Sequence, residues 1–210
     1  MPRRPEQSDT VRLEAFSDGV FAIAITLLVL EIHVPSITAS DHGRALPAAL
    51  LHLWPSFLGY TISFVTIGIM WANHHSIFRY VRATDRTFTL INVGFLMCIS
   101  FLPFPTALLA EYLPVPDGRR TAVAVYSATF IVVAIAFNAL WRYAVWENRL
   151  LADDHDRAAV RVITTRYLLG PVSYGVSLAL AFVNVWASLA VHGLLAAYYV
   201  VSEHQPLRRR

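Results

Sequence analysis

Residues 12–31 decide the fold, and they read RLEAFSDGVFAIAITLLVLE. Only 12 uncharged residues, Gly19 to Leu30, separate Asp18 from Glu31. A helix of that length spans ~18 Å, which is too short for a ~30 Å hydrocarbon core. A helix that begins at Arg12 reaches ~28 Å, but it carries Asp18 roughly 9 Å into the membrane. Because a carboxylate at that depth is costly in lipid, we expect Asp18 to face protein or water.

The whole chain has the composition of an integral membrane protein. Hydrophobic residues make up 56% of the 210 residues and charged residues 15%, whereas soluble domains average about 25% charged. Charges delimit long apolar stretches, which predict an all-α protein with six transmembrane helices in a single domain, 1–210. We expect these helices at residues 10–34, 53–78, 87–110, 121–145, 160–183 and 185–202. Pro103 and Pro105 predict a kink or break late in the third helix.

The arginines set the expected orientation in the membrane. All 17 basic residues are Arg, and 14 of them fall in the two terminal segments and the loops on the same side as the termini. The other side carries Arg44, Arg119 and Arg120. Cytoplasmic segments are enriched in basic residues, so both termini are expected in the cytoplasm. The basic residues therefore indicate membrane topology, and no nucleic-acid partner is expected.

Polar residues of the second and third expected helices lie at the depth of Asp18. Counted from the nearest charges, His74, His75 and Asn92 reach ~6–9 Å into the membrane from the cytoplasmic side. One polar layer that joins the first three helices is a coherent hypothesis. It has two interpretations: a structural network that fixes helix packing, or a proton-sensing or gating network, since histidine changes charge near neutral pH.

The opposite face of the first helix is aliphatic and aromatic. At 100° per residue Asp18 points ~140° away from Ile23. Thr26 lies ~60° to one side of Ile23 on the same wheel. Taken alone, such a stripe contacts lipid or another helix. Its members are Phe16, Val20, Ile23, Leu27, Leu30 and Val34.

Three elements resemble one family of membrane proteins. Arg12, followed by Phe16, Ser17 and Asp18, resembles the RxxxFSD signature of the transmembrane protein 175 family of potassium channels. Residues 71–75, WANHH, resemble its Trp/His element on helix 2 through Trp71, His74 and His75. Asn92 and residues 101–106, FLPFPT, resemble its helix 3 pattern. By motif, the resemblance covers roughly residues 10–110.

The resemblance implies a mechanism and a set of site residues. A single-repeat chain of this kind is similar to the bacterial form, a homotetramer whose first helices line a central pore in the cell (inner, plasma) membrane. The family's constriction residues correspond to Ile23, Leu27 and Leu30, and Thr26 matches a threonine linked to potassium preference. The pore has no carbonyl-lined TVGYG filter, and no such loop occurs here. Potassium is the permeant ion and no cofactor is expected.

The two ends of this helix raise a charge problem. Arg12 lies ~20° from Ile23 on the wheel, so we expect it to be paired or turned to lipid headgroups. Glu31 lies ~80° from the stripe, where it could attract cations to the outer mouth.

Other classes of function stay open from the residues alone. A secondary transporter normally shows paired repeats with broken helices, and no such pairing is evident. A proton-permeable cation pathway is compatible with the same fold. A membrane metalloenzyme would need several histidine clusters, whereas His74 and His75 form one pair, so we expect no enzyme activity.

Overall fold

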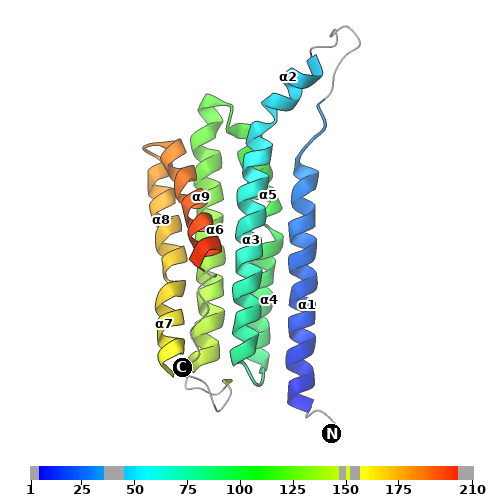
Figure 1. Cartoon of the computed structure of the whole chain (residues 1–210), viewed down its shortest axis with the longest axis vertical. Helices are drawn as coiled ribbons and strands as arrows, with labels where there is room; N and C mark the ends of the chain where they lie inside the picture. Colours follow the sequence, from blue (N-terminus) through cyan, green and yellow to red (C-terminus); the bar gives the residue numbers. More distant parts are fainter. Residues whose placement is uncertain (1–4, 36–44, 147–149, 152–156, 203–210) are drawn as a thin grey trace.

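The computed structural model describes residues 5–35, 45–146, 150–151 and 157–202. Within these ranges the chain forms α-helices, one 3-10 turn, and one bridge between Val81 and Leu151. The all-α class predicted from the sequence is therefore confirmed for the described residues. The long helices run side by side along the long axis of the molecule (Figure 1).

Helix α1 (Pro5–Leu27) continues into the 3-10 turn η1 (Leu28–Glu31). It lies at one edge of the bundle, with α3 in front and α4 and α5 behind (Figure 1). The expected limits, 10–34, were wrong at both ends, because the helix begins earlier and stops before Val34. Ile32 already has extended backbone angles, and Pro35 disfavours a helical conformation at the residue before it.

The middle of the bundle consists of α3 (Trp54–Tyr80), α4 (Arg86–Ser100) and α5 (Pro103–Tyr112). Asp85 caps α4, because its carboxylate accepts a hydrogen bond from the backbone N–H of Phe88 at 2.7 Å. The third expected helix is broken between α4 and α5. Prolines at 103 and 105 have no N–H to donate to the preceding turn, which explains the break.

A short helix, α2 (Ala45–His52), precedes α3 and was not predicted. The sequence has 34 uncharged residues between Arg44 and Arg79, more than one membrane crossing needs. The helices expected from the sequence leave residues 45–52 unassigned. The structure instead uses them for a separate helix, which meets α3 at Leu53.

The remaining helices are α6 (Pro116–Val145), α7 (Arg157–Tyr167), α8 (Leu169–Ala181) and α9 (Val185–Ser202). One helix was expected over 160–183, but the structure divides it at Leu168. Pro171 has no N–H for the carbonyl of Tyr167, four residues earlier. The side-chain amide of Asn138, on α6, donates to that carbonyl at 2.9 Å instead. Between α8 and α9, the Asn184 side chain accepts from the backbone of Trp186 at 3.0 Å.

Two kinds of packing hold the bundle together. The apolar core is continuous along the bundle, and its largest fully buried side chains include Trp141, Tyr126, Phe88, Phe95 and Phe130. A second, polar cluster joins α6, α8 and α9. The Ser127 hydroxyl lies 3.0 Å from the Ser177 hydroxyl and 3.1 Å from His192 Nε2, and the Ser177 and Ser188 hydroxyls lie 2.8 Å apart. These hydrogen bonds satisfy polar groups that would be costly to bury unpaired.

Candidate functional site on α1

A buried chain of polar groups ties α1 to α3 and α4. The side-chain amide of Asn92 donates to the Ser17 hydroxyl at 2.9 Å, and its carbonyl oxygen lies 2.8 Å from His74 Nε2. All three side chains are fully buried. The Ser17 hydroxyl in turn donates to the carbonyl of Leu13, at 2.8 Å. This part of α1 is therefore held by directional bonds whose loss would leave buried groups unpaired.

Two more polar contacts join α1 to α3, one helical turn apart. Trp71 Nε1 donates to the Asp18 carboxylate at 2.9 Å, and His75 Nδ1 lies 2.8 Å from the Glu14 carboxylate. Glu14 and Asp18 are one turn apart on α1, as Trp71 and His75 are on α3. The Trp71 and His75 rings stack with centroids 6.1 Å apart. These two contacts place the side chains of Glu14 and Asp18 against α3.

The polar layer forms, but its pairs differ from those expected. Asp18 was expected to meet His74, His75 or Asn92, and its hydrogen bond instead comes from Trp71. Asn92 reaches Ser17, one residue earlier. Sequence reasoning missed Glu14 altogether. The available signal was the four-residue spacing of Glu14 and Asp18, which puts both carboxylates on one helix face.

The face of α1 turned away from the bundle is open and apolar. Ile23 is 62% exposed, Leu27 40% and Leu30 67%. Phe16, nearer the N-terminus, lies on the same face with 55% exposed. The intervening Phe21, Ala24 and Leu28 are buried against α3 and α4. The described chain therefore leaves uncovered the aliphatic stripe that was predicted to form a constriction.

Thr26 lies on the exposed face of α1. Its hydroxyl is 2.9 Å from the carbonyl oxygens of both Ala22 and Ile23, to which it donates. A hydroxyl whose proton is directed to the backbone keeps its lone pairs free to accept. Outward-facing lone pairs of this kind can contact a cation.

The two ends of the open face carry charge. Arg12, at the N-terminal end, is exposed. Glu31, the last residue of η1, is partly exposed beside a surface groove of about 340 Å³ that Leu27, Leu30 and Phe104 also line. A carboxylate placed at one end of an apolar face favours cations over anions there.

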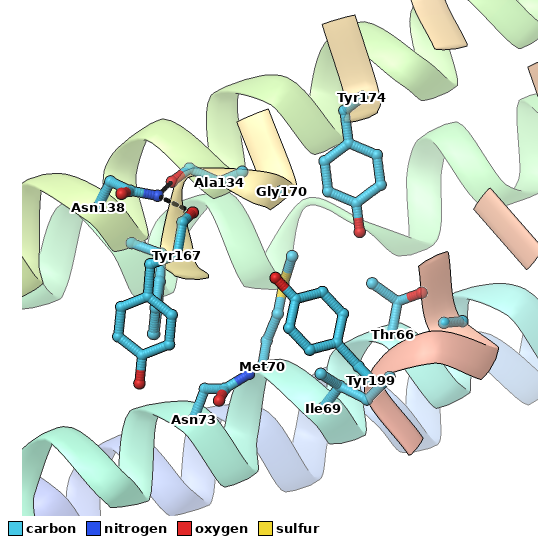
Figure 2. A pocket seen from close by; sticks show the side chains of 12 residues that line it. Thr66, Ile69, Met70, Asn73, Ala134, Asn138, Tyr167, Gly170, Tyr174 and Tyr199 are labelled. Carbon is cyan, nitrogen blue, oxygen red and sulfur yellow. Dashed lines mark hydrogen bonds between the residues drawn. The ribbon is translucent and has the colours of Figure 1, made fainter. Parts of the chain in front are cut away.

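A partly open cavity lies away from α1, between α3, α6, α8 and α9 (Figure 2). Asn138 and Tyr174 come from one wall, and Asn73 and Met70 come from α3 on the other. The cavity measures about 50 Å³, well below the ~150 Å³ of a cavity that holds benzene. It is therefore too small for an organic substrate. In the part of the chain that the structure describes, no three His, Cys, Asp or Glu side chains group to hold a metal ion.

Comparisons with known proteins agree in pointing to one family. The sequence pattern described as "Endosomal/lysosomal potassium channel TMEM175" matches residues 12–103. A potassium channel of Chamaesiphon minutus is 51% identical over 96% of this chain and 98% of its own length. A potassium channel of Streptomyces collinus is 45% identical over 91% and 92%. The endosomal/lysosomal proton channel TMEM175 of Danio rerio is 36% identical over 68% of this chain and 27% of its own length.

A solved structure matches the fold as well. It is the crystal structure of a lysosomal potassium-selective channel TMEM175 homolog from Chamaesiphon minutus. The two structures superpose with a TM-score of 0.85 at 47% sequence identity. The match covers 95% of this chain and 100% of the other.

Proposed function

This chain belongs to the TMEM175 potassium channel family, and we propose that it is a potassium-selective cation channel whose pore is lined by α1. The single observation that carries the proposal is the open apolar face of α1. Phe21, Ala24 and Leu28 on the other face of the helix are buried, yet Ile23 and Leu30 remain more than half exposed. One helix per chain cannot enclose a pore, so we propose a homotetramer in which four copies of this face surround a central axis.

Ile23, Leu27 and Leu30 form the constriction in this proposal. Rings of aliphatic side chains expel water when the pore is narrow, which provides a hydrophobic gate. An ion that passes them loses hydration without gaining oxygen ligands, so selectivity for potassium over sodium is modest. The outward lone pairs of Thr26 return part of the lost coordination. The Arg12 side chain turns away from the pore axis toward lipid headgroups, and the Glu31 carboxylate attracts cations to the outer mouth of the pore.

The membrane arrangement follows from the helices and the arginines. Four described helices are long and apolar enough to cross a membrane: residues 9–31, 54–80, 86–112 and 116–145. We propose that α7 with α8 and the shorter α9 complete six crossings. The arginine distribution supports a cytoplasmic location for both termini. The bacterial relatives support a prokaryotic plasma membrane as the location.

Proton permeation is a second candidate function, because the animal relatives are named proton channels. The Gallus gallus protein is 38% identical to this chain, which covers 28% of it. Protons and potassium share the α1 pore in this alternative. A pH-sensitive dye inside the same vesicles distinguishes the two ions.

Flux from liposomes tests the proposal directly. Purified protein is reconstituted, and efflux is measured under a potassium gradient and then a sodium gradient. Ile23→Asn is compared with the parent and with Val132→Asn, whose parent residue is similarly exposed but lies on α6. We expect potassium flux to exceed sodium flux in the parent and in Val132→Asn, and the preference to weaken in Ile23→Asn. Folded parent protein that passes neither ion would overturn the channel assignment.

A further inference from the structure

The two flanks of α1 differ in shape and chemistry. The helix lies at the edge of the bundle between α3 on one side and α4 and α5 on the other (Figure 1). Following the proposed function, α1 of each copy faces a central axis. A rotation about that axis then turns the α3 flank of one copy toward the α4–α5 flank of the next, because cyclic interfaces join unlike surfaces.

The α3 flank presents a ridge of aromatic side chains. Phe57 is 49% exposed, Phe64 40% and Trp71 43%. Seven-residue spacing keeps the three within ~40° on a helical wheel. The hydrogen bond from Trp71 to Asp18 shows that the ridge runs beside α1. Phe64 also contacts the ring of Tyr60, with centroids 5.6 Å apart, which supports its orientation.

The α4–α5 flank presents a groove. About 340 Å³ of open space lies between Leu27 and Leu30 on one side and Phe101 and Phe104 on the other. The two phenylalanine rings lie 5.2 Å apart and are 51% and 54% exposed. A second hollow of about 600 Å³ shares Phe101 and continues between α4 and α6. This flank therefore offers an aromatic-lined recess next to the pore-lining face.

The ridge and the groove lie at the same depth. The hydroxyls of Ser63 and Thr106 are 2.7 Å apart, which places Phe64, the next residue, level with Phe104, within about one helical turn. Rotation about an axis normal to the membrane changes no residue's depth. The ring of Phe64 in one copy therefore meets the level of the groove in its neighbour.

We propose that Phe64 of one copy enters the groove of the next and packs against Phe101 and Phe104 there, and that this contact forms the interface that closes the ring of subunits. The occupant of the groove is a second copy of this chain. An aromatic ring in this groove makes offset or edge-to-face contacts with Phe101 and Phe104, which the alkyl chain of a lipid does not supply. The inference rests on the proposed function, because it takes α1 as the helix nearest the axis.

Disulfide cross-linking tests the contact. The chain has one cysteine, Cys98, so Cys98→Ser gives a cysteine-free background. Into it go the pair Phe64→Cys and Phe104→Cys, each single variant, and a control pair of Phe64→Cys with Val176→Cys. Val176 is 50% exposed and comes one residue before Ser177, whose hydroxyl contacts Ser127 on α6. The adjacent Tyr126 hydroxyl lies 2.9 Å from that of Ser63, so Val176 is at a depth similar to that of Phe64. It lies on α8, however, at the other side of the bundle (Figure 1). Membranes are oxidised and run on denaturing gels without reductant.

We expect a ladder up to four chains from the Phe64/Phe104 pair and only monomer from the single variants and the control pair. Monomer from the Phe64/Phe104 pair, or a ladder from the control pair, would overturn the interface. Size-exclusion chromatography of reduced samples shows that each variant folds, and the liposome flux assay runs in parallel. Flux without the ladder rejects the interface but keeps the channel, with lipid as the occupant of the groove. The ladder without flux supports the interface and rejects the channel.

Discussion

Helices α1 and α6 have similar apolar composition but opposite roles in the packing. In the most apolar window of each helix, 22% of the residues of α1 and 50% of those of α6 are buried inside the chain. α6 packs against its neighbours over a larger part of its surface than α1 does, although Val132 and Ile135 of α6 remain exposed. The difference teaches that a hydrophobic helix can be built for contacts outside its own chain, and that burial separates the two cases where hydropathy does not.

The two helices also differ in how their polar groups are used. On α6, Ser127 takes part in a cluster with α8 and α9 that is closed to solvent. On α1, the polar contacts gather between Glu14 and Asp18, and the helix beyond them is held by apolar packing. Directional polar contacts therefore hold α1 in its N-terminal half, whereas apolar packing holds it from Gly19 onward.

The largest expected loss of stability comes from a substitution in the buried face of α6. Trp141→Ala empties a fully buried site on α6 and removes the hydrogen bond to Thr164. Loss of a buried Trp typically costs about 3–5 kcal/mol of unfolding free energy. Chemical unfolding in detergent micelles measures it. Trp146→Ala, on the same segment but 56% exposed, serves as the control, and equal losses in both variants would contradict the packing contrast.

The anchor of α1 should show an intermediate effect. Asn92→Leu removes both hydrogen bonds of the buried chain and leaves Ser17 and His74 without that partner. We expect a loss of about 1–3 kcal/mol, the usual cost of an unsatisfied buried group. The same unfolding assay measures it. Val93→Ala, at the neighbouring exposed position, should stay near the parent, and an Asn92→Leu protein as stable as the parent would show that the chain does not anchor α1.

The contact between Glu14 of α1 and His75 of α3 should contribute less. Glu14→Gln removes the carboxylate that lies 2.8 Å from Nδ1 of His75, whose side chain is 52% exposed. Partly exposed pairs contribute about 0.2–1 kcal/mol because water and salt screen them. Unfolding at low and high salt measures it, and the difference from the parent should shrink as salt rises. A difference that is independent of salt would mean that Glu14 acts through packing and not through charge.

The smallest change in stability should come from the open face. Ile23→Ala removes side-chain atoms that the chain itself leaves uncovered, so the unfolding free energy should stay within about 0.5 kcal/mol of the parent. The same variant should raise cation flux, because a smaller side chain widens the proposed constriction. A large loss of stability with unchanged flux would place Ile23 in a core, and the contrast between α1 and α6 would fail.

Much of the architecture could be predicted from charge spacing and proline positions. The long apolar helices follow from runs without charge, and the break before Pro103 follows from its missing N–H. The exposed stripe on α1 follows from helical periodicity. These features depend on residues near each other in the sequence. That is why local rules were sufficient for them.

The missed features depend on contacts between distant segments. Ser127, Ser177 and His192 lie far apart in sequence, and no local pattern brings them together. The choice of Trp71 over histidine as the partner of Asp18 depends on the relative rotation of two helices, which periodicity does not give. The division between α7 and α8 depends on Pro171 and also on Asn138, whose side-chain amide donates to the carbonyl of Tyr167.

The 3-10 turn at the end of α1 has a geometric consequence for a pore. In an α-helix, residues three apart diverge by ~60°, so successive side chains describe a spiral. In a 3-10 turn they eclipse, with a rise of about 2.0 Å per residue. Because η1 begins right after Leu27, Leu27 and Leu30 approach a vertical column about 6 Å apart. Four such columns would join two separate narrow points into one continuous hydrophobic constriction. A longer constriction excludes water more strongly than a short one of the same width.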